Sequence, residues 1–145
     1  MPEVIATYDP GADISIQAGV GLTGGRCVGP PTSRNAGGPA GISDTGDGLL
    51  VCGLPAAAGL IFGVASHDAL AGQRVDILRA PKVVPIECSA AIAIGAEVQT
   101  GTDGRVATFA PGAAARPIGM ALSVTSAGGQ LCQVSLYSAG STQNA

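Results

Sequence analysis

A stretch that occurs twice in this chain of 145 residues constrains its fold more than any other feature. The first copy starts at Ile61 and reads IFGVASHDALAGQRVDIL, and the second starts at Pro117 and reads PIGMALSVTSAGGQLCQVSL. Each copy begins with a short apolar run, continues into a turn of small residues that ends in Gly-Gln, and closes with alternating apolar and polar residues. This pattern predicts two strands in each copy, and therefore two similar β modules.

The residues that precede the two copies also repeat. The segment Ile-Ser-Ile at 14–16 aligns with Val-Pro-Ile at 84–86, and the segment 25–28, which starts with glycine, aligns with 95–98. In both halves of the chain a strand with period-two alternation is therefore followed by a glycine turn and a second extended run.

The first module is longer because of an inserted loop. Residues 29–48 read GPPTSRNAGGPAGISDTGDG, and this run of Gly, Pro, Ser and Asp predicts a loop over its whole length. With this loop the first module spans about residues 14–79, and the second spans 83–137. Together they are predicted to form a single β domain over residues 14–138.

Both ends of the chain are predicted to lie outside this domain. Residues 1–13 contain two Pro and only one short apolar run, Val4-Ile5, which suits an extended N-terminal arm that becomes ordered on a neighbouring molecule. Residues 139–145 are small and polar and are expected to form a flexible C-terminal tail.

The composition favours an all-β fold with a core of small side chains. The chain has 23 Gly and 10 Pro, only 3% aromatic residues and no Trp, so Val, Ile, Leu and Ala must fill the core. No segment of helical length shows a 3.6-residue period. Short strands between Gly-rich turns are typical of a small β-barrel or sandwich-like domain, and the pattern leaves open whether the modules form one barrel or two packed sheets.

The charge and the lengths of the apolar runs argue against nucleic acid and membranes as partners. The formal net charge is −3 and the seven Lys and Arg residues are scattered, so no basic patch is available to neutralise phosphates. No run approaches the roughly 20 apolar residues that a membrane-spanning helix needs. A poorly charged surface on such an apolar chain favours packing against other subunits.

The cysteines are predicted to be structural. Cys27, Cys52, Cys88 and Cys132 show no C-x-x-C spacing, and with a single His in the chain they cannot make a typical zinc site. We expect them to be buried and reduced, in a protein made in the cytoplasm of a bacterial host, with no metal and no cofactor.

No catalytic residue is predicted. The segment GVGLTG at 19–24 matches the dinucleotide-binding pattern G-x-G-x-x-G, but an extended run follows it instead of a helix, so we interpret it as a turn before a strand. His67 and Asp68 are adjacent, yet the second copy has Ser123 and Val124 in their places, so the turn does not require them. The acidic residues are spread singly, and we predict that the chain is not an enzyme.

Four segments in order resemble one known family, the head decoration or capsid cement proteins of tailed bacteriophages, especially those of actinobacterial hosts. They are PGADISIQAGVGLTGGRCV, GLIFGVASHDALAGQRVDIL, AAIAIGAEVQTGTDGRVATF and RPIGMALSVTSAGGQLCQVSLY. The likeness covers roughly residues 10–137, with the inserted loop and the cysteines at Cys27 and Cys132 as departures. The resemblance implies a structural virion protein on the outer surface of the capsid, a homotrimer that binds the major capsid protein and stabilises contacts between its subunits.

The arm and the inserted loop are the expected contact segments for the capsid or for other copies of the chain. We expect the arm to supply the apolar contacts and the loop to be the second candidate. The expected interface residues are Pro2, Glu3, Val4, Ile5, Tyr8, Arg34 and Asn35.

Two other functions would suit a small barrel. A phage tail or baseplate subunit, or a carbohydrate-binding module, shares this architecture, but a carbohydrate-binding module normally exposes aromatic rings and this chain has few. A hydrolase that uses His67 ranks third, because nothing else in the sequence supports it.

Overall fold

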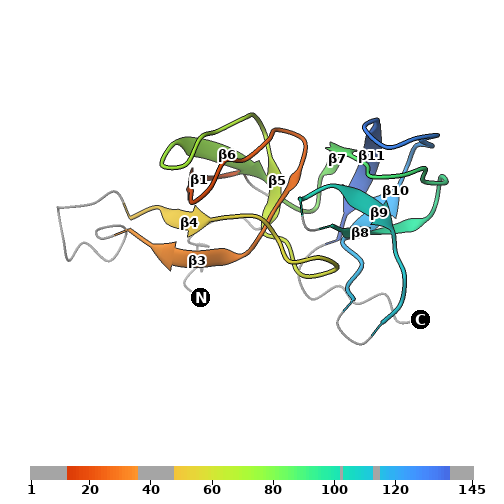
Figure 1. The fold of residues 1–145 in the computed structure, drawn as a ribbon, viewed down its shortest axis with the longest axis horizontal. Coiled ribbons are helices and arrows are strands. Elements are labelled where there is room, and N and C mark those ends of the chain that lie inside the picture. The colour runs from red at the N-terminus through yellow and green to blue at the C-terminus, as the bar shows by residue number, and fades with distance from the viewer. Residues whose placement is uncertain (1–12, 36–47, 102, 113–114, 138–145) are drawn as a thin grey trace, which may run out of the picture.

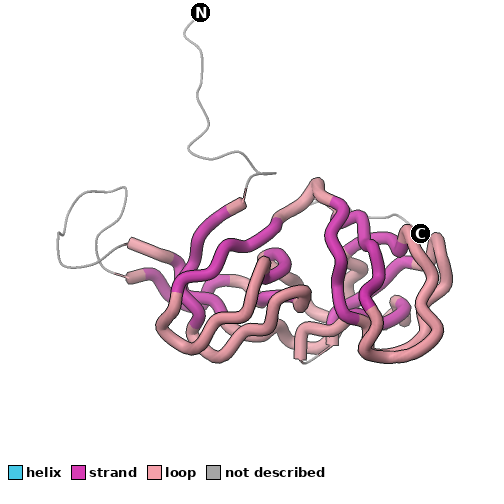
Figure 2. The backbone as a smooth tube through the Cα atoms, turned by 90° about the horizontal axis from the view of Figure 1, so that it is seen from above, coloured by secondary structure: helices cyan, strands magenta, loops and turns pink. Residues whose placement is uncertain are grey.

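The computed structural model describes residues 13–35, 48–101, 103–112 and 115–137, and these ranges form eleven strands and no helix. The strands make two sheets that lie next to each other along the long axis of the molecule, as Figure 1 and Figure 2 show. Each sheet takes its strands from one half of the chain. The prediction of an all-β, barrel- or sandwich-like fold with two similar modules is confirmed.

The first sheet has six strands in the order β2-β5-β6-β1-β4-β3. They are β1 (Ile14–Ala18), β2 (Cys27–Val28), β3 (Pro31–Arg34), β4 (Leu50–Cys52), β5 (Gly63–Ala65) and β6 (Arg74–Leu78). The edge strands β2 and β3 are separated along the chain only by Gly29 and Pro30, and the N–H of Gly29 donates to the C=O of Gly53 at 2.8 Å. The sheet therefore curls until its two edges meet, as in a small barrel.

The second sheet has five strands in the order β7-β11-β10-β8-β9. They are β7 (Val83–Glu87), β8 (Glu97–Thr100), β9 (Val106–Thr108), β10 (Gly119–Ala121) and β11 (Leu131–Leu136). A parallel bridge between Cys88 and Val106 joins the two edges, and the N–H of Ser89 donates to the C=O of Val106 at 2.9 Å. The second sheet thus closes in the same way, which protects its edge strands from pairing with other chains.

Corresponding strand pairs have the same register in the two sheets. Ile16 of β1 lies opposite Val75 of β6, and Ile86 of β7 lies opposite Cys132 of β11. All four side chains are buried. Because successive side chains of a strand point to opposite faces, the alternation in the sequence places these four residues in the core.

The Gly-Gln pair that ends each repeated turn has a structural role. Gly72 has a φ of 87° and its counterpart in the second copy has 86°, a left-handed conformation that glycine adopts without strain. The next side chain then folds back over the turn. Oε1 of Gln73 accepts a hydrogen bond from the N–H of Leu70 at 2.9 Å, and Oε1 of Gln130 accepts one from the N–H of Ser126 at 2.8 Å.

The segment predicted as a loop over residues 29–48 is in part a strand, so that prediction was wrong for β3. This strand pairs with β4 in antiparallel fashion, with an irregularity after Pro31. It lies at the edge of the sheet and all four of its residues are exposed, so it needs no apolar alternation and tolerates a proline. Because β3 lacks apolar alternation, the sequence pattern did not indicate a strand here. Residues 36–47 of the predicted loop lie outside the described residues.

The core consists of two clusters, one of which draws on both modules. The first cluster surrounds Ile16, and the second surrounds Ile86 but also includes Cys27 and Val64 of the first sheet. The largest fully buried side chains are Ile and Val, which agrees with the predicted core of small residues. Because the second cluster is shared, the two sheets cannot separate without exposing apolar surface to water.

The predicted tail at 139–145 and almost all of the predicted arm at 1–13 lie outside the described residues. Asp13 is the exception. Its carboxylate accepts a hydrogen bond from Nζ of Lys82, a residue of the linker between the two sheets. The chain therefore enters the domain beside this linker.

Candidate functional site

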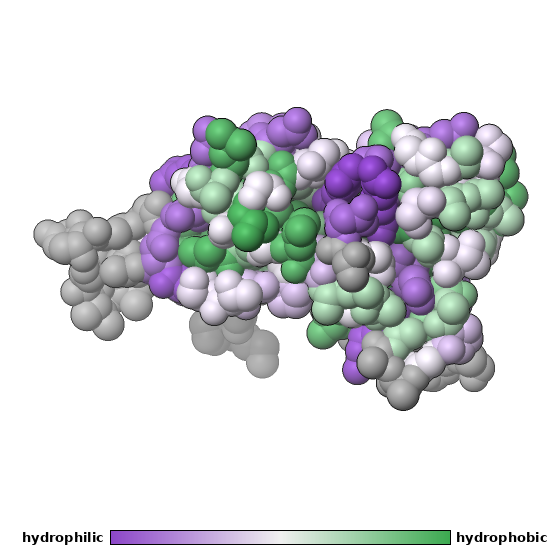
Figure 3. Space-filling view, in the orientation of Figure 1, coloured by the Kyte–Doolittle hydropathy of each residue, from purple (hydrophilic) through white to green (hydrophobic). Residues whose placement is uncertain are grey.

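The two modules meet at four charged residues, Arg26, Glu87, Asp103 and Arg105, which we call the junction cluster. Nε of Arg26 donates a hydrogen bond to Oε2 of Glu87 at 2.9 Å. Nε of Arg105 forms ion pairs with Oε1 of Glu87 at 3.1 Å and with Oδ2 of Asp103 at 3.5 Å. A single carboxylate thus joins a cation of the first module to one of the second, and Figure 3 shows hydrophilic side chains where the modules meet.

Solvent reaches the junction cluster only in part. The Glu87 side chain is 19% exposed and that of Arg26 is 23% exposed. The hydrogen bond to Glu87 raises the pKa of the Arg26 guanidinium, because it favours the charged form. Solvent and salt screen ion pairs with this degree of burial less than fully exposed ones.

Backbone hydrogen bonds reinforce the junction. The N–H of Glu87 donates to the C=O of Gly25, and the N–H of Cys27 donates to the C=O of Gly104, both at 2.8 Å. Gly104 has a φ of 82°, and a Cβ at this position would lie 2.5 Å from the carbonyl oxygen of Cys27. The turn between β8 and β9 therefore fits against the first module only with glycine here.

Of the predicted interface residues, the structure describes Arg34 and Asn35, which lie where β3 ends and the connection to β4 begins. Nε of Arg34 donates to the C=O of Gly48 at 2.9 Å. Nδ2 of Asn35 donates to Oε1 of Gln17 at 2.6 Å. The first contact lies within the β3–β4 hairpin, and the second attaches the hairpin to β1. The other predicted interface residues, Pro2, Glu3, Val4, Ile5 and Tyr8, lie outside the described residues.

His67 and Asp68 have the contacts of a structural turn. Oδ1 of Asp68 accepts a hydrogen bond from the N–H of Gly24 at 2.8 Å. A Cβ at Gly24 would lie 2.8 Å from Cα of His67, so the two turns pack directly against each other. The segment GVGLTG leads through Gly25 into β2, in agreement with its interpretation as a turn before a strand.

The described part of the chain offers no group of three or more His, Cys, Asp or Glu side chains that could hold a metal ion. Within the same residues, no helix is long and apolar enough to cross a membrane.

The four cysteines are buried and unpaired, as the sequence predicts. Burial raises the pKa of the Cys27 thiol to about 12, and a weaker hydrogen bond with Thr100 acts in the opposite direction. Such a thiol stays protonated near neutral pH and behaves as a small apolar side chain.

Three exposed apolar side chains, Ile94, Leu122 and Val124, lie at the outer end of the second module, and we call them the end patch. Their exposed fractions are 69%, 45% and 72%. Ile94 and Val124 flank the antiparallel bridge between Ile92 and Thr125, which joins the two loops that carry the patch. These loops turn at the end of the molecule that faces away from the first sheet (Figure 1).

The equivalent positions of the first module are not apolar. Aligning the two repeats places Gly24 opposite Ile94, Ser66 opposite Leu122 and Asp68 opposite Val124. The alignment of the two repeats already shows these differences in polarity, but a single apolar residue in a turn does not indicate whether its side chain is buried. The structure adds that all three side chains face solvent.

Comparison with known proteins identifies one family. A family model described as a phage cement protein matches residues 4–136. No curated protein matches the sequence.

A solved structure, the crystal structure of the N base of head fiber gp8.5 in bacteriophage phi29, is similar with a TM-score of 0.63. The match covers 87% of this chain and 93% of that chain at 16% sequence identity. At this identity the likeness shows a common fold.

Proposed function

The chain belongs to the phage cement protein family and is a structural, capsid-associated protein, and we propose that it binds the outer surface of an icosahedral phage head and stabilises contacts between major capsid subunits. The observation that carries this proposal is the family match, which spans both modules and part of the N-terminal arm. The similar fold belongs to a protein of a phage head, which supports the same location.

The physical basis of the proposed stabilisation is mass action. A protein that binds the assembled shell, but not the separate subunits, shifts the equilibrium towards the assembled shell. To bridge two subunits it must hold its own contact surfaces at a fixed separation. The shared core and the junction cluster supply this rigidity, because they connect the two modules through buried apolar contacts and a common carboxylate.

We assign the capsid contact to the arm and the contact between copies to the body of the domain. The arm residues Val4, Ile5 and Tyr8 provide apolar side chains, with Pro2 and Glu3 beside them. The pairing of Asp13 with Lys82 holds the domain end of the arm next to the linker between the two sheets. Arg34 and Asn35 lie where β3 ends and the connection to β4 begins. We propose a homotrimer as the assembled form.

Cosedimentation with capsids tests the proposal. Purified protein is mixed with empty phage heads that lack it, the heads are pelleted, and the bound protein is quantified against protein centrifuged alone. We expect saturable binding at a fixed number of copies per head, and heads that dissociate at a higher temperature once occupied. Protein that stays in the supernatant at all head concentrations would show that the assignment to the capsid surface is wrong.

A further inference from the structure

The strand pair β7–β11 is apolar on the side that faces away from the core, where a solvated strand face is ordinarily polar. Val83 is 54% exposed and Leu131 is 61% exposed. Pro85, two residues along β7, is also exposed. Residues directly opposite each other in an antiparallel pair share a face. We call this set the outer face, and its members are Val83, Pro85 and Glu87 of β7 with Leu131, Gln133 and Ser135 of β11.

The polar members of the outer face do not oppose an apolar contact. The carboxylate of Glu87 is the only charged group among the six residues, and it already pairs with Arg26 and Arg105. The other two polar members, an amide and a hydroxyl, are neutral. An apolar segment can therefore cover the three apolar members without burying an unpaired ion.

The outer face is bounded at both ends. At one end the linker, residues 79–82, leads directly into β7. At the other end the first module contacts both strands: the N–H of Glu87 donates to the C=O of Gly25 at 2.8 Å, and a Cβ on Gly25 would lie 3.8 Å from Cδ2 of Leu131. A segment that starts at the linker and follows β7 thus ends against the first module.

The N-terminal arm meets the domain at the linker end of this face. The carboxylate of Asp13 pairs with Nζ of Lys82, and Lys82 directly precedes Val83 in the chain. Because this ion pair anchors the last residue of the arm, the residues before it are tethered beside the outer face. Tethering raises the effective concentration of the arm at this face above that of any separate molecule.

The arm carries apolar side chains over a matching length. They are Val4, Ile5 and Tyr8, and the segment 4–8 covers as many residue steps as β7 does from its first to its last residue. An extended chain rises about 3.3 Å per residue, so both spans are about 13 Å long. The pair Pro10-Gly11, which commonly forms turns, allows the arm to change direction between this segment and its anchor.

We propose that residues 4–8 of the arm pack along the outer face of their own chain, antiparallel to β7. This orientation follows because the arm and β7 both lead away from the linker, the arm towards the N-terminus and β7 towards the C-terminus. It places Tyr8 near Val83, and Val4 near Leu131. The contact removes apolar area of both partners from water. It concerns the protein in the absence of a capsid, so it goes beyond the proposed function.

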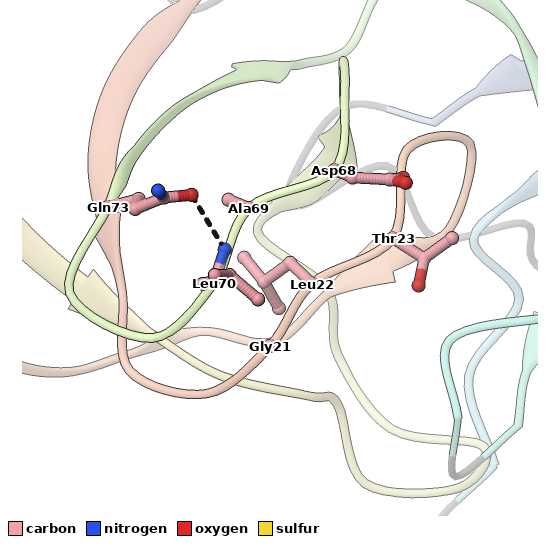
Figure 4. Close-up of a pocket in the computed structure, with 7 residues that line it drawn as sticks. All are labelled: Gly21, Leu22, Thr23, Asp68, Ala69, Leu70 and Gln73. Atoms are coloured by element: carbon pink, nitrogen blue, oxygen red, sulfur yellow. Dashed lines mark hydrogen bonds between the residues drawn. The ribbon is translucent and has the colours of Figure 1, made fainter.

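Another exposed apolar side chain, Leu70, borders a shallow hollow of about 500 Å³ on the first module. Figure 4 shows that Asp68 and Thr23 also line this hollow. Residues 1–12 contain two acidic residues and no Lys or Arg, so the carboxylate of Asp68 repels the arm. Leu70 therefore provides a control position with similar exposure and no expected contact with the arm.

Disulfide trapping tests the contact on the full-length chain. Val4→Cys is combined with Leu131→Cys in the test variant and with Leu70→Cys in the control variant. The four native thiols are buried, so they do not compete. With oxidised glutathione as the oxidant, we expect the test variant to form its intramolecular disulfide at least about tenfold faster than the control, because a disulfide needs the two Cα atoms close together. Mass spectrometry after digestion identifies the linked peptides.

Tyrosine fluorescence provides a second measurement without introduced cysteines. The chain has two Tyr and no Trp, so in a Tyr137→Phe background the emission comes from Tyr8 alone. Val83→Asp places a carboxylate in the proposed contact, and we expect it to increase acrylamide quenching of Tyr8 at least about twofold. Leu70→Asp should leave quenching unchanged. Circular dichroism verifies that each variant is folded.

Three results would overturn this placement of the arm. They are equal trapping rates in the test and control variants, a disulfide that links two chains and so assigns the face to the arm of a second copy, and quenching of Tyr8 that Val83→Asp does not change. Neither measurement uses capsids. Their failure leaves the proposed function intact, whereas a trapped disulfide in a protein that does not bind heads would refute the proposed function alone.

Discussion

Arg26 and Glu87 lie 61 positions apart in the sequence, yet their side chains form a 2.9 Å hydrogen bond that links the first module to the second. The same carboxylate also pairs with Arg105. The guanidinium groups of Arg26 and Arg105 come from different modules and share the carboxylate of Glu87 as a counter-ion. Both lose this counter-ion when Glu87 is neutralised. This arrangement makes Glu87 the residue through which the rigidity of the junction can be tested.

Glu87→Gln should lower the free energy of unfolding by about 1–3 kcal/mol, because two partly buried guanidinium groups lose their counter-ion. For a chain of this length that corresponds to a fall of several degrees in Tm. Urea unfolding measures the effect. The matched control is Asp103→Asn, whose side chain is 49% exposed and 3.5 Å from Arg105, and it should change stability by less than about 0.5 kcal/mol. Equal stability of Glu87→Gln and wild type would contradict the assigned role.

Much of the fold could be predicted, because the repeated pattern of apolar and polar residues indicates where strands and turns lie. A slip of one residue would turn Ile16 or Ile86 out of the core, so the alternation fixed the register of both strand pairs. Strand β3 escaped prediction for the opposite reason. Its residues are all exposed at a sheet edge, so its sequence lacks the alternation of apolar and polar residues that indicates a half-buried strand.

The candidate surfaces were harder to predict, because they depend on which side chains face solvent after folding. Val124 and its equivalent Asp68 occupy similar turns, and only the structure shows that Val124 stays 72% exposed. Likewise, no spacing in the sequence indicates that Glu87 meets Arg26 and Arg105, since all three belong to different strands or turns. Contacts between modules arise from tertiary packing, which local patterns do not record.

Gly63→Ala and Gly119→Ala should both destabilise the protein strongly. A Cβ would lie 2.4 Å from the carbonyl oxygen of Leu78 in the first case and 2.4 Å from that of Ser135 in the second. Each contact lies within a strand pair, so the backbone must shift to relieve it, at a cost of about 1–3 kcal/mol or more. Gly21→Ala is the control, because its Cβ would meet nothing within 4 Å. Thermal unfolding compares the three, and a tolerated Gly63→Ala would contradict the close strand packing.

Cys27 should make the protein less stable in alkaline solution. Burial raises the pKa of its thiol from 9.0 to about 12, so between these values the unfolded chain releases a proton that the folded protein keeps. Stability is therefore unaffected below pH 9 and falls above it, by up to about 1.4 kcal/mol per pH unit. Urea unfolding at pH 8.5 and pH 10 should show a smaller loss for Cys27→Val than for the wild type. Identical losses would mean that the thiol is not shielded from ionisation.

Deleting residues 2–9 should abolish binding to phage heads without unfolding the domain. The deletion removes the proposed contacts Val4, Ile5 and Tyr8, but it keeps Asp13 and its pairing with Lys82, so the start of β1 remains attached to the linker. Cosedimentation with empty heads measures binding, and urea unfolding verifies the fold. Removal of residues 139–145 provides a control of similar length at the other end and should leave binding unchanged. Full occupancy of the heads by the chain without residues 2–9 would exclude the arm as the capsid contact and direct attention to the body of the domain.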